Sequence, residues 1–259
     1  IRNSAGKVTN STISVTCNGI DVTSLKAIGN TEYDVEIAHN IITTSQRTPI
    51  TAYSGADVFI HHNELAGAGE GSGIAIYSSK AEIHNNEIGP IGGWNGLWLL
   101  GSFDVIAENN SIFETTREPI LAGEYGTQAP SPTPARLYLA NNTISTQGSG
   151  ACSSTRWWGG PFTCPAIMAH RSGVTIVDNG INAAGTADGI RATGALLDVR
   201  RNTFNVQGTG AILQNYDSGF ADSQQYGTLA FFSNNEWNGV GAVSYTHLRA
   251  HETLRYLVC

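Results

Sequence analysis

The sequence is poor in charged residues and nearly lacks methionine. Only 14% of its 259 residues are Asp, Glu, Lys or Arg, and Met168 is the single methionine. The 14 basic residues are outnumbered by 21 acidic ones, so the clustered positive charge that nucleic-acid binding requires is missing. No apolar run approaches the roughly 18 residues of a membrane-spanning helix. The composition therefore argues against nucleic-acid partners and against a helical membrane span.

Glycine and asparagine are abundant instead. The chain holds 30 glycines, and its asparagines often stand beside a second Asn or a His. These residues suit tight turns between short strands, and the length suits one large domain. The chain begins at Ile1 without a signal peptide, so we expect a processed or truncated N-terminus.

A repeat centred on one asparagine dominates the sequence. Apolar residues stand five and three positions before this Asn and two positions after it. The nine asparagines are Asn18, Asn40, Asn63, Asn86, Asn110, Asn142, Asn179, Asn202 and Asn235. Their spacing is 22 to 24 residues, with three longer intervals of 32, 37 and 33. Alternating apolar positions predict strands, and an Asn, which tolerates left-handed backbone, is predicted to form a stacked ladder at a corner.

A further apolar segment follows each corner, usually beginning with Gly-Ile, Pro-Ile or Ala-Ile. Each period thus supplies three short strands, and coils of about 23 residues can bury their apolar faces only by stacking. The spaced leucines and helical segment of a leucine-rich repeat are missing. The prediction is an all-β, single-stranded parallel β-helix with three parallel sheets and about nine coils.

This pattern resembles the right-handed parallel β-helix repeats of pectate-lyase-like and NosD-like proteins over residues 10–240. The resemblance implies that the Asn corner joins the second and third sheets, and that the Gly-Ile segment belongs to the first. It implies no single activity, because this fold carries lyases, hydrolases, adhesins and inert stalks.

Residues 243–259 differ in character from the repeats. They resemble the translation of a sequencing adapter, with a genuine C-terminal helix as the alternative. We therefore predict a β-helix domain at 1–242, as a fragment of a longer protein, and a non-native tail at 243–259.

Three insertions, at 124–135, 147–165 and 216–227, border the predicted first sheet and point to its outer face as a ligand site. Aromatic rings with Arg and His suit sugar binding. The candidates are Tyr53, Tyr77, Trp98, Trp157, Trp158, His170 and Arg191. The alternative is a satellite core, in which the insertions cover the outward side chains Trp98, Leu100, Leu121 and Met168. The last outward positions are predicted to be Leu213 and Asn215.

Cys152 and Cys164 bracket an 11-residue loop. A disulfide there would stabilise the loop by about 3 kcal/mol in the chain-entropy view and would imply an oxidising compartment. Two buried free thiols are the alternative. Cys17 is expected to be free and partly buried.

No catalytic motif is present. Glu118 and Asp188 occupy equivalent corners two coils apart, about 10 Å by strand spacing, close to the roughly 6.5–9.5 Å of inverting glycosidases. A lyase would use His170 or Arg191 as its base. Solvated surface carboxylates are the alternative.

A column of His61, His84 and Glu108, with His39 and His62 one place over, has the composition of a transition-metal set. A free exterior column of stacked side chains is favoured, so neither a metal nor a cofactor is predicted.

The sequence thus favours a secreted or cell-surface β-helix module that binds polysaccharide or acts as an extracellular scaffold. We expect it to be a monomeric part of a larger chain, with a cell-surface glycan as its partner. The alternatives are a polysaccharide lyase or inverting glycoside hydrolase, and a structural stalk without ligand.

Overall fold

The structure is a computed structural model that describes most of the chain. The described residues are 5–23, 35–53, 55–67, 69–77, 79–100, 104–123, 135–147, 151–152, 162–214, 227–239 and 243–246. Every regular element within them is a strand. A search of the same residues finds no helix with the length and apolarity to cross a membrane.

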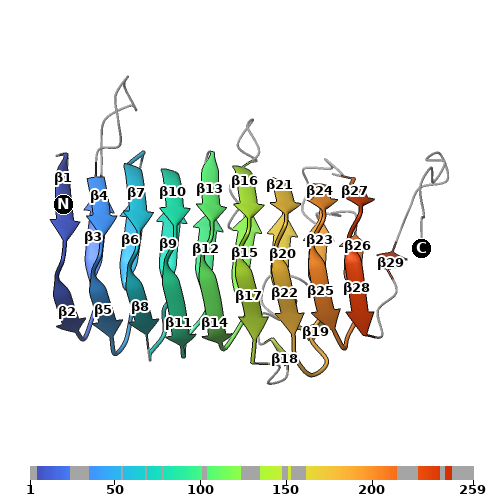
Figure 1. Ribbon diagram of the computed structural model, residues 1–259, viewed down its shortest axis with the longest axis horizontal. Helices are drawn as coiled ribbons and strands as arrows, with labels where there is room; N and C mark the ends of the chain where they lie inside the picture. Colours follow the sequence, from blue (N-terminus) through green and yellow to red (C-terminus); the bar gives the residue numbers. More distant parts are fainter. Residues whose placement is uncertain are drawn as a thin grey trace, which may run out of the picture.

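The strands form three sheets that run the length of a solenoid (Figure 1). The first sheet holds β3 (Ile20–Thr23), β6 (Ile50–Tyr53), β9 (Ile74–Tyr77), β12 (Leu97–Leu100), β15 (Ile120–Gly123), β20 (Ile167–His170), β23 (Ile190–Thr193), β26 (Ala211–Gln214) and β29 (Val243–Thr246). The second holds β1 (Gly6–Thr9), β4 (Val35–Ala38), β7 (Asp57–His61), β10 (Lys80–His84), β13 (Val105–Glu108), β16 (Ala135–Ala140), β21 (Ser172–Val177), β24 (Leu196–Arg200) and β27 (Leu229–Ser233). The third holds β2 (Thr12–Val15), β5 (Ile41–Thr44), β8 (Glu64–Gly67), β11 (Glu87–Ile91), β14 (Ser111–Thr115), β17 (Thr143–Thr146), β22 (Gly180–Ala183), β25 (Thr203–Val206) and β28 (Glu236–Gly239).

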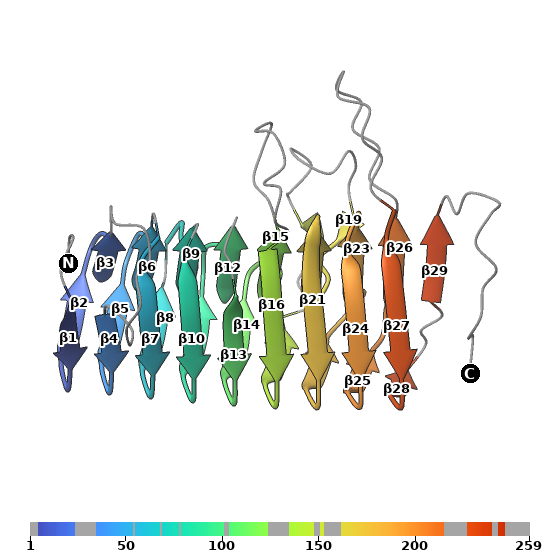
Figure 2. The ribbon, with the colours of Figure 1, turned by 90° about the horizontal axis from the view of Figure 1, so that it is seen from above.

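Each coil visits the second, third and first sheets in turn, and each strand pairs in parallel with its equivalents one coil before and after. Figure 2 shows the second-sheet strands side by side in chain order. The prediction of a parallel β-helix with three sheets is confirmed. The only other pair in the described residues is a short antiparallel ribbon of β18 (Ala151–Cys152) and β19 (Phe162–Thr163).

The core is a set of aliphatic columns inside the solenoid. Alternate residues of most solenoid strands from β3 to β26 point inward, as the period of two demands, and the isoleucines of neighbouring coils stack on one another. Ile60, Ile83 and Ile88 are fully buried, as are most of their equivalents. Near the last described coils the column changes to aromatic rings, with Phe204 stacked on Trp237 at 4.0 Å between ring centroids.

The asparagine ladder is confirmed from Asn40 to Asn235, at the corner between the second and third sheets. At each step the backbone N–H and the side-chain Nδ2 of one Asn both donate to Oδ1 of the next, at 2.8–3.0 Å. Buried amides with satisfied donors and acceptors tie every coil to its neighbours.

The left-handed residue of this corner is not the ladder Asn, contrary to the sequence prediction. It is the residue before the ladder Asn, or before Ser11 in the first coil, with φ between 51° and 57°. These residues are Asn10, His39, His62, Asn85, Asn109, Asn141, Asp178, Arg201 and Asn234. The ladder Asn is freed from making the bend, so its amide can be aligned for stacking.

The prediction that Asn18 belongs to this ladder is wrong. Its place is taken by Ser11, whose N–H donates to Asn40 Oδ1 at 3.0 Å. Asn18 lies at the corner that leads into β3, and its Nδ2 donates to the Asp21 carboxylate at 2.9 Å. The error arose because Ile13 and Val15 mimic the strand before a ladder Asn but belong to β2.

Two further differences concern register and insertions. Ile190 pairs with Ala211, so Ala211 and Leu213 point inward, and Ile212 and Gln214 point outward, one residue from the prediction. Residues 24–34, between β3 and β4, form a fourth long connection that the misplaced Asn18 concealed. They lie outside the described residues, as does most of each predicted insertion.

The backbone of 243–246 forms β29 and pairs in parallel with β26. Residues 247–259 lie outside the described residues, so the predicted boundary at 242 stays a prediction.

Candidate functional site

The outer face of the first sheet carries two columns of side chains. Register places Thr51, Ala75, Trp98, Leu121, Met168, Arg191 and Ile212 in one column. It places Tyr53, Tyr77, Leu100, Gly123, His170, Thr193 and Gln214 in the other. The predicted ligand residues of the described part of the chain therefore do share one face, but they fall into two regions along it.

The first region is a row of aromatic rings on β6, β9 and β12. Tyr53 and Tyr77 stack at 5.0 Å between centroids with their planes 9° apart. Trp98 lies 5.3 Å from Tyr77 at 69°, and Trp94 lies 4.9 Å from Trp98 at 78°. All four rings are partly exposed. We call these four residues the aromatic row.

The aromatic row is extended by a cation that the sequence prediction did not include. The Arg117 guanidinium lies 5.5 Å from the centre of the Trp94 ring. The two residues occupy equivalent positions in successive coils, each three places before its first-sheet strand, and Arg117 N–H donates to Trp94 O at 3.1 Å. The register of the repeat was the signal that could have identified this pair.

The second region lies on β20 and β23, and its β20 side chains are buried. Met168 and His170 are 2% and 8% exposed although both point out of the sheet. Burial, with the Arg171 charge adding to it, lowers the pKa of His170 to about 3. His170 is therefore a neutral side chain in a packed setting at neutral pH, and Leu100 on β12 is buried in the same way.

Leu100 and Met168 are buried, as the satellite-core alternative expects, whereas Trp98 and Leu121 are partly exposed. Covering by the insertions stays a prediction, because most of each insertion lies outside the described residues. Arg191 is partly exposed, and burial lowers the pKa of its guanidinium. The remaining predicted ligand residues, Trp157 and Trp158, lie outside the described residues.

Glu118 and Asp188 occupy a second polar corner, between the third and first sheets. Both are buried, at 2% and 4% exposure. Asn95 Nδ2 donates to Glu118 Oε2 at 3.1 Å, and the backbone N–H of Thr209 donates to Asp188 Oδ1 at 2.9 Å. The alternative of solvated surface carboxylates is therefore wrong, because these groups bridge neighbouring coils within the wall.

Burial raises the pKa of Glu118, which is a property of general acids. Pro165 occupies the equivalent position in the coil between Glu118 and Asp188, so the two carboxylates lie two coils apart, as predicted. Catalysis by Glu118, His170, Asp188 or Arg191 stays a prediction.

The cysteines differ from one another. Cys164 is buried and disulfide-bonded, so the alternative of free thiols is wrong for it. The side chain of Cys152 lies outside the described residues, but its backbone pairs with Phe162 in the β18–β19 ribbon, two residues from Cys164. The Cys152–Cys164 bridge stays a prediction that this ribbon supports. Cys17 is free, as predicted, and exposed rather than partly buried.

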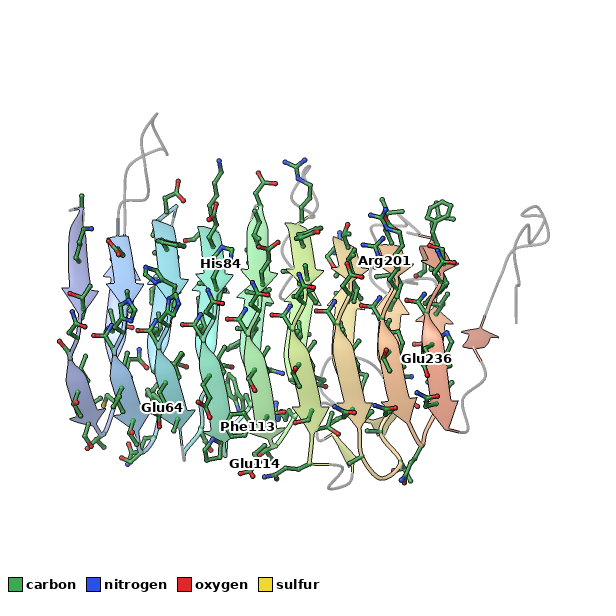
Figure 3. The ribbon with its side chains drawn as sticks, viewed as in Figure 1. Glu64, His84, Phe113, Glu114, Arg201 and Glu236 are labelled. Atoms are coloured by element: carbon green, nitrogen blue, oxygen red, sulfur yellow. The ribbon has the colours of Figure 1, made fainter. Side chains whose placement is uncertain are left out.

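The predicted histidine column separates into two groups. His39, His61 and His62 lie together, with one ring nitrogen from each within 4.8 Å of the others. Burial, and then the charges of His61 and His39, lower the pKa of His62. His84, labelled in Figure 3, instead faces carboxylates. Its Nε2 lies 3.3 Å from Glu82 Oε2, and its Nδ1 lies 3.5 Å from Glu108 Oε2.

Comparison with known proteins identifies a family but no near relative. The model of the family described as "Right handed beta helix region" matches residues 1–157. A search of curated proteins gives no match. One similar solved structure is the A-module of a mannuronan C-5 epimerase from Azotobacter vinelandii, at 12% identity and a TM-score of 0.40, covering 97% of this chain and 91% of that one.

A second similar structure is the Dettilon tailspike protein, at 11% identity and a TM-score of 0.34. That alignment covers 92% of this chain and 60% of the tailspike chain. Likeness at this level carries no argument about the function of this chain.

Proposed function

Given that the chain belongs to the right-handed β-helix family, we propose that it is an extracellular module whose aromatic row binds polysaccharide. The observation that carries the proposal is the continuity of the row. Rings from three successive coils contact one another along the solenoid axis and remain partly exposed.

The ring orientations suit a sugar chain lying along that axis. The Tyr53–Tyr77 stack uses ring faces for each other, so the pair offers ring edges to a ligand. Burial raises the pKa of Tyr53, which keeps its hydroxyl a hydrogen-bond donor. Trp98 is rotated by 69° out of this stack, and a rotated indole face suits the apolar face of a sugar ring.

Two further observations support the extracellular location and the binding of polysaccharide. The disulfide of Cys164 is typical of proteins that reach an oxidising compartment, which supports a secreted or cell-surface location. Arg117 beside Trp94 adds hydrogen-bond donors that suit sugar hydroxyls or carboxylates at one end of the row.

The test is binding to an array of neutral and acidic soluble polysaccharides, followed by calorimetry on any ligand found. We expect Trp98→Leu and Tyr77→Leu to weaken binding at least about tenfold, by loss of stacking and apolar contact. Tyr138→Leu is the matched control, because Tyr138 is an exposed tyrosine on the second sheet. Melting temperatures of all variants establish that each one is folded.

The outcomes separate the three functions. Binding that depends on Trp98 and Tyr77, without new reducing ends or unsaturated products, supports the module. Turnover that is lost in Glu118→Gln would replace it by a carbohydrate-active enzyme. Absence of binding to every polysaccharide would overturn the proposal and leave the stalk. Equal weakening by Tyr138→Leu would overturn the aromatic row as the binding site.

A further inference from the structure

Three imidazoles converge on the corner between the second and third sheets. His61 ends β7, His62 follows it in the left-handed turn, and His39 occupies the equivalent turn one coil earlier. His39 and His62 stack at 4.9 Å with their planes 20° apart, and the His61 ring stands at 86–87° to both. The three form the one group of this kind found among the described residues.

Backbone geometry explains only part of this arrangement. His, Asn and Asp are enriched at left-handed positions, so the turn tolerates His39 and His62. Other coils meet the same demand with asparagine, as at Asn85, Asn109 and Asn141. His61 is a strand residue with ordinary backbone, and its equivalents one coil before and three coils after are Ala38 and Ala140. The fold therefore does not require imidazoles here.

A carboxylate orients the central ring. Glu36 Oε1 lies 3.2 Å from His61 Nε2, and Glu36 is itself paired with Lys7. The Glu36 carboxylate, held between the Lys7 ammonium and the His61 ring, is the acceptor of both contacts. Nε2 of His61 then carries the hydrogen, which leaves the Nδ1 lone pair facing His62 Nδ1 at 2.9 Å. Carboxylate–histidine pairs of this kind orient metal-bound imidazoles.

Distances within the group suit a shared ion. His61 Nδ1 and His62 Nδ1 are 2.9 Å apart. Two nitrogens bound at about 2.0–2.1 Å are roughly 2.9 Å apart at a right angle and roughly 3.4 Å apart at the tetrahedral angle. His39 and His62 are exposed and His61 is partly exposed, so an ion can enter from solvent and keep water at its remaining positions.

We propose that His39, His61 and His62 bind one divalent transition-metal ion, with Glu36 as the positioning residue for His61. Imidazole ligands favour copper, nickel and zinc over magnesium and calcium, and the general order of stability places copper first. This site is separate from the aromatic row, because the histidines lie at the corner between the second and third sheets and the aromatic row lies on the first sheet.

The test is calorimetric titration of tag-free protein with CuCl₂, ZnCl₂ and, as a negative control, MgCl₂. We expect one equivalent of copper and of zinc to bind, copper more tightly, and magnesium not to bind. His39→Asn and His62→Asn install the residue that other coils carry at this turn, and His61→Ala copies Ala38. Each variant should therefore fold while lowering the metal affinity at least about tenfold.

Two comparisons make the result specific. Glu36→Gln is expected to lower the affinity by about tenfold, in the range found for residues that orient metal-bound histidines. His84→Ala removes the next histidine of the same column, which faces carboxylates, and should change the affinity by less than about twofold. Absence of saturable copper and zinc binding at 1 mM metal, or equal losses in His84→Ala and His61→Ala, would overturn the proposal.

Discussion

Removing one amide from the middle of the asparagine ladder should destabilise the whole solenoid. Asn86 Nδ2 donates to Ile60 O, His84 O and Asn110 Oδ1, each at 3.0 Å. Its Oδ1 accepts from both the backbone N–H and Nδ2 of Asn63, also at 3.0 Å. Asn86→Ala deletes all five contacts from a residue that is 2% exposed.

The size of this loss in stability follows from the buried hydrogen-bonding groups that Asn86→Ala leaves without a partner. The Asn63 N–H loses its acceptor, which costs about 1–3 kcal/mol for a buried donor. The other lost hydrogen bonds add about 0.5–1.5 kcal/mol each where no new partner is found. The lower ends of these contributions add to about 3 kcal/mol. We therefore expect Asn86→Ala to lower the free energy of unfolding by at least about 3 kcal/mol, a large share of the roughly 5–15 kcal/mol of a typical domain.

Urea unfolding followed by circular dichroism measures this loss, and Asn18→Ala supplies the control. Asn18 matches the repeat in sequence, yet among the described residues its amide donates to the Asp21 carboxylate at the surface and not to a ladder Asn. We expect Asn18→Ala to change the free energy of unfolding by less than about 0.5 kcal/mol. Equal effects of the two substitutions, or a loss below about 1 kcal/mol in Asn86→Ala, would refute the ladder as the element that ties the coils together.

Two further predictions concern acid stability and coil contact. The pKa of His170 is lowered to about 3 in the folded protein. As the pH drops, the unfolded chain therefore takes up a proton at this residue before the folded one does. The free energy of unfolding should fall between about pH 6.5 and pH 3, by up to about 1.4 kcal/mol per pH unit. His170→Gln should flatten this part of the unfolding free energy measured against pH, and parallel curves for both proteins would contradict the assignment. Gly93→Ala would place a Cβ 2.0 Å from the backbone oxygen of Gly69 in the previous coil, and should cost at least about 1–3 kcal/mol in chemical unfolding. Gly180→Ala meets no atom within 4 Å and should unfold like the unchanged protein, so similar losses in both variants would argue against the predicted clash.

The fold could be predicted from the sequence because every coil of a solenoid carries the same pattern of apolar residues around one Asn. Eight of the nine predicted ladder asparagines, Asn40 to Asn235, are in the ladder. The prediction succeeded for them because the alternation of apolar residues and the spacing of the asparagines mark the same coils. The exception, Asn18, shows the weakness of a four-residue pattern. Alternating apolar residues occur in all three sheets, and only strand pairing distinguishes β2 from a second-sheet strand.

For the candidate sites, the sequence predicted which residues share a column on one face, but it did not predict which side chains contact one another. Register placed Tyr53, Tyr77 and Trp98 on one face, yet ring orientation and the burial of His170 depend on packing around that face. The histidine column was predicted as one set. The observed separation of His61 from His84 depends on the carboxylates beside each ring, which no spacing rule specifies.

The left-handed turn gives this protein a surface that can vary without disturbing the interior. Its backbone conformation admits only a few residue types at low cost, but the side chain there takes no part in the ladder. The same turn carries a histidine stack at His39 and His62. Further along the solenoid it carries Arg201, labelled in Figure 3, whose Nη2 donates to Asp178 Oδ2 at 2.7 Å. Substitutions at these turn positions can therefore change the surface chemistry of each coil independently, at intervals of about 4.8 Å along the solenoid, without changing the backbone or the ladder.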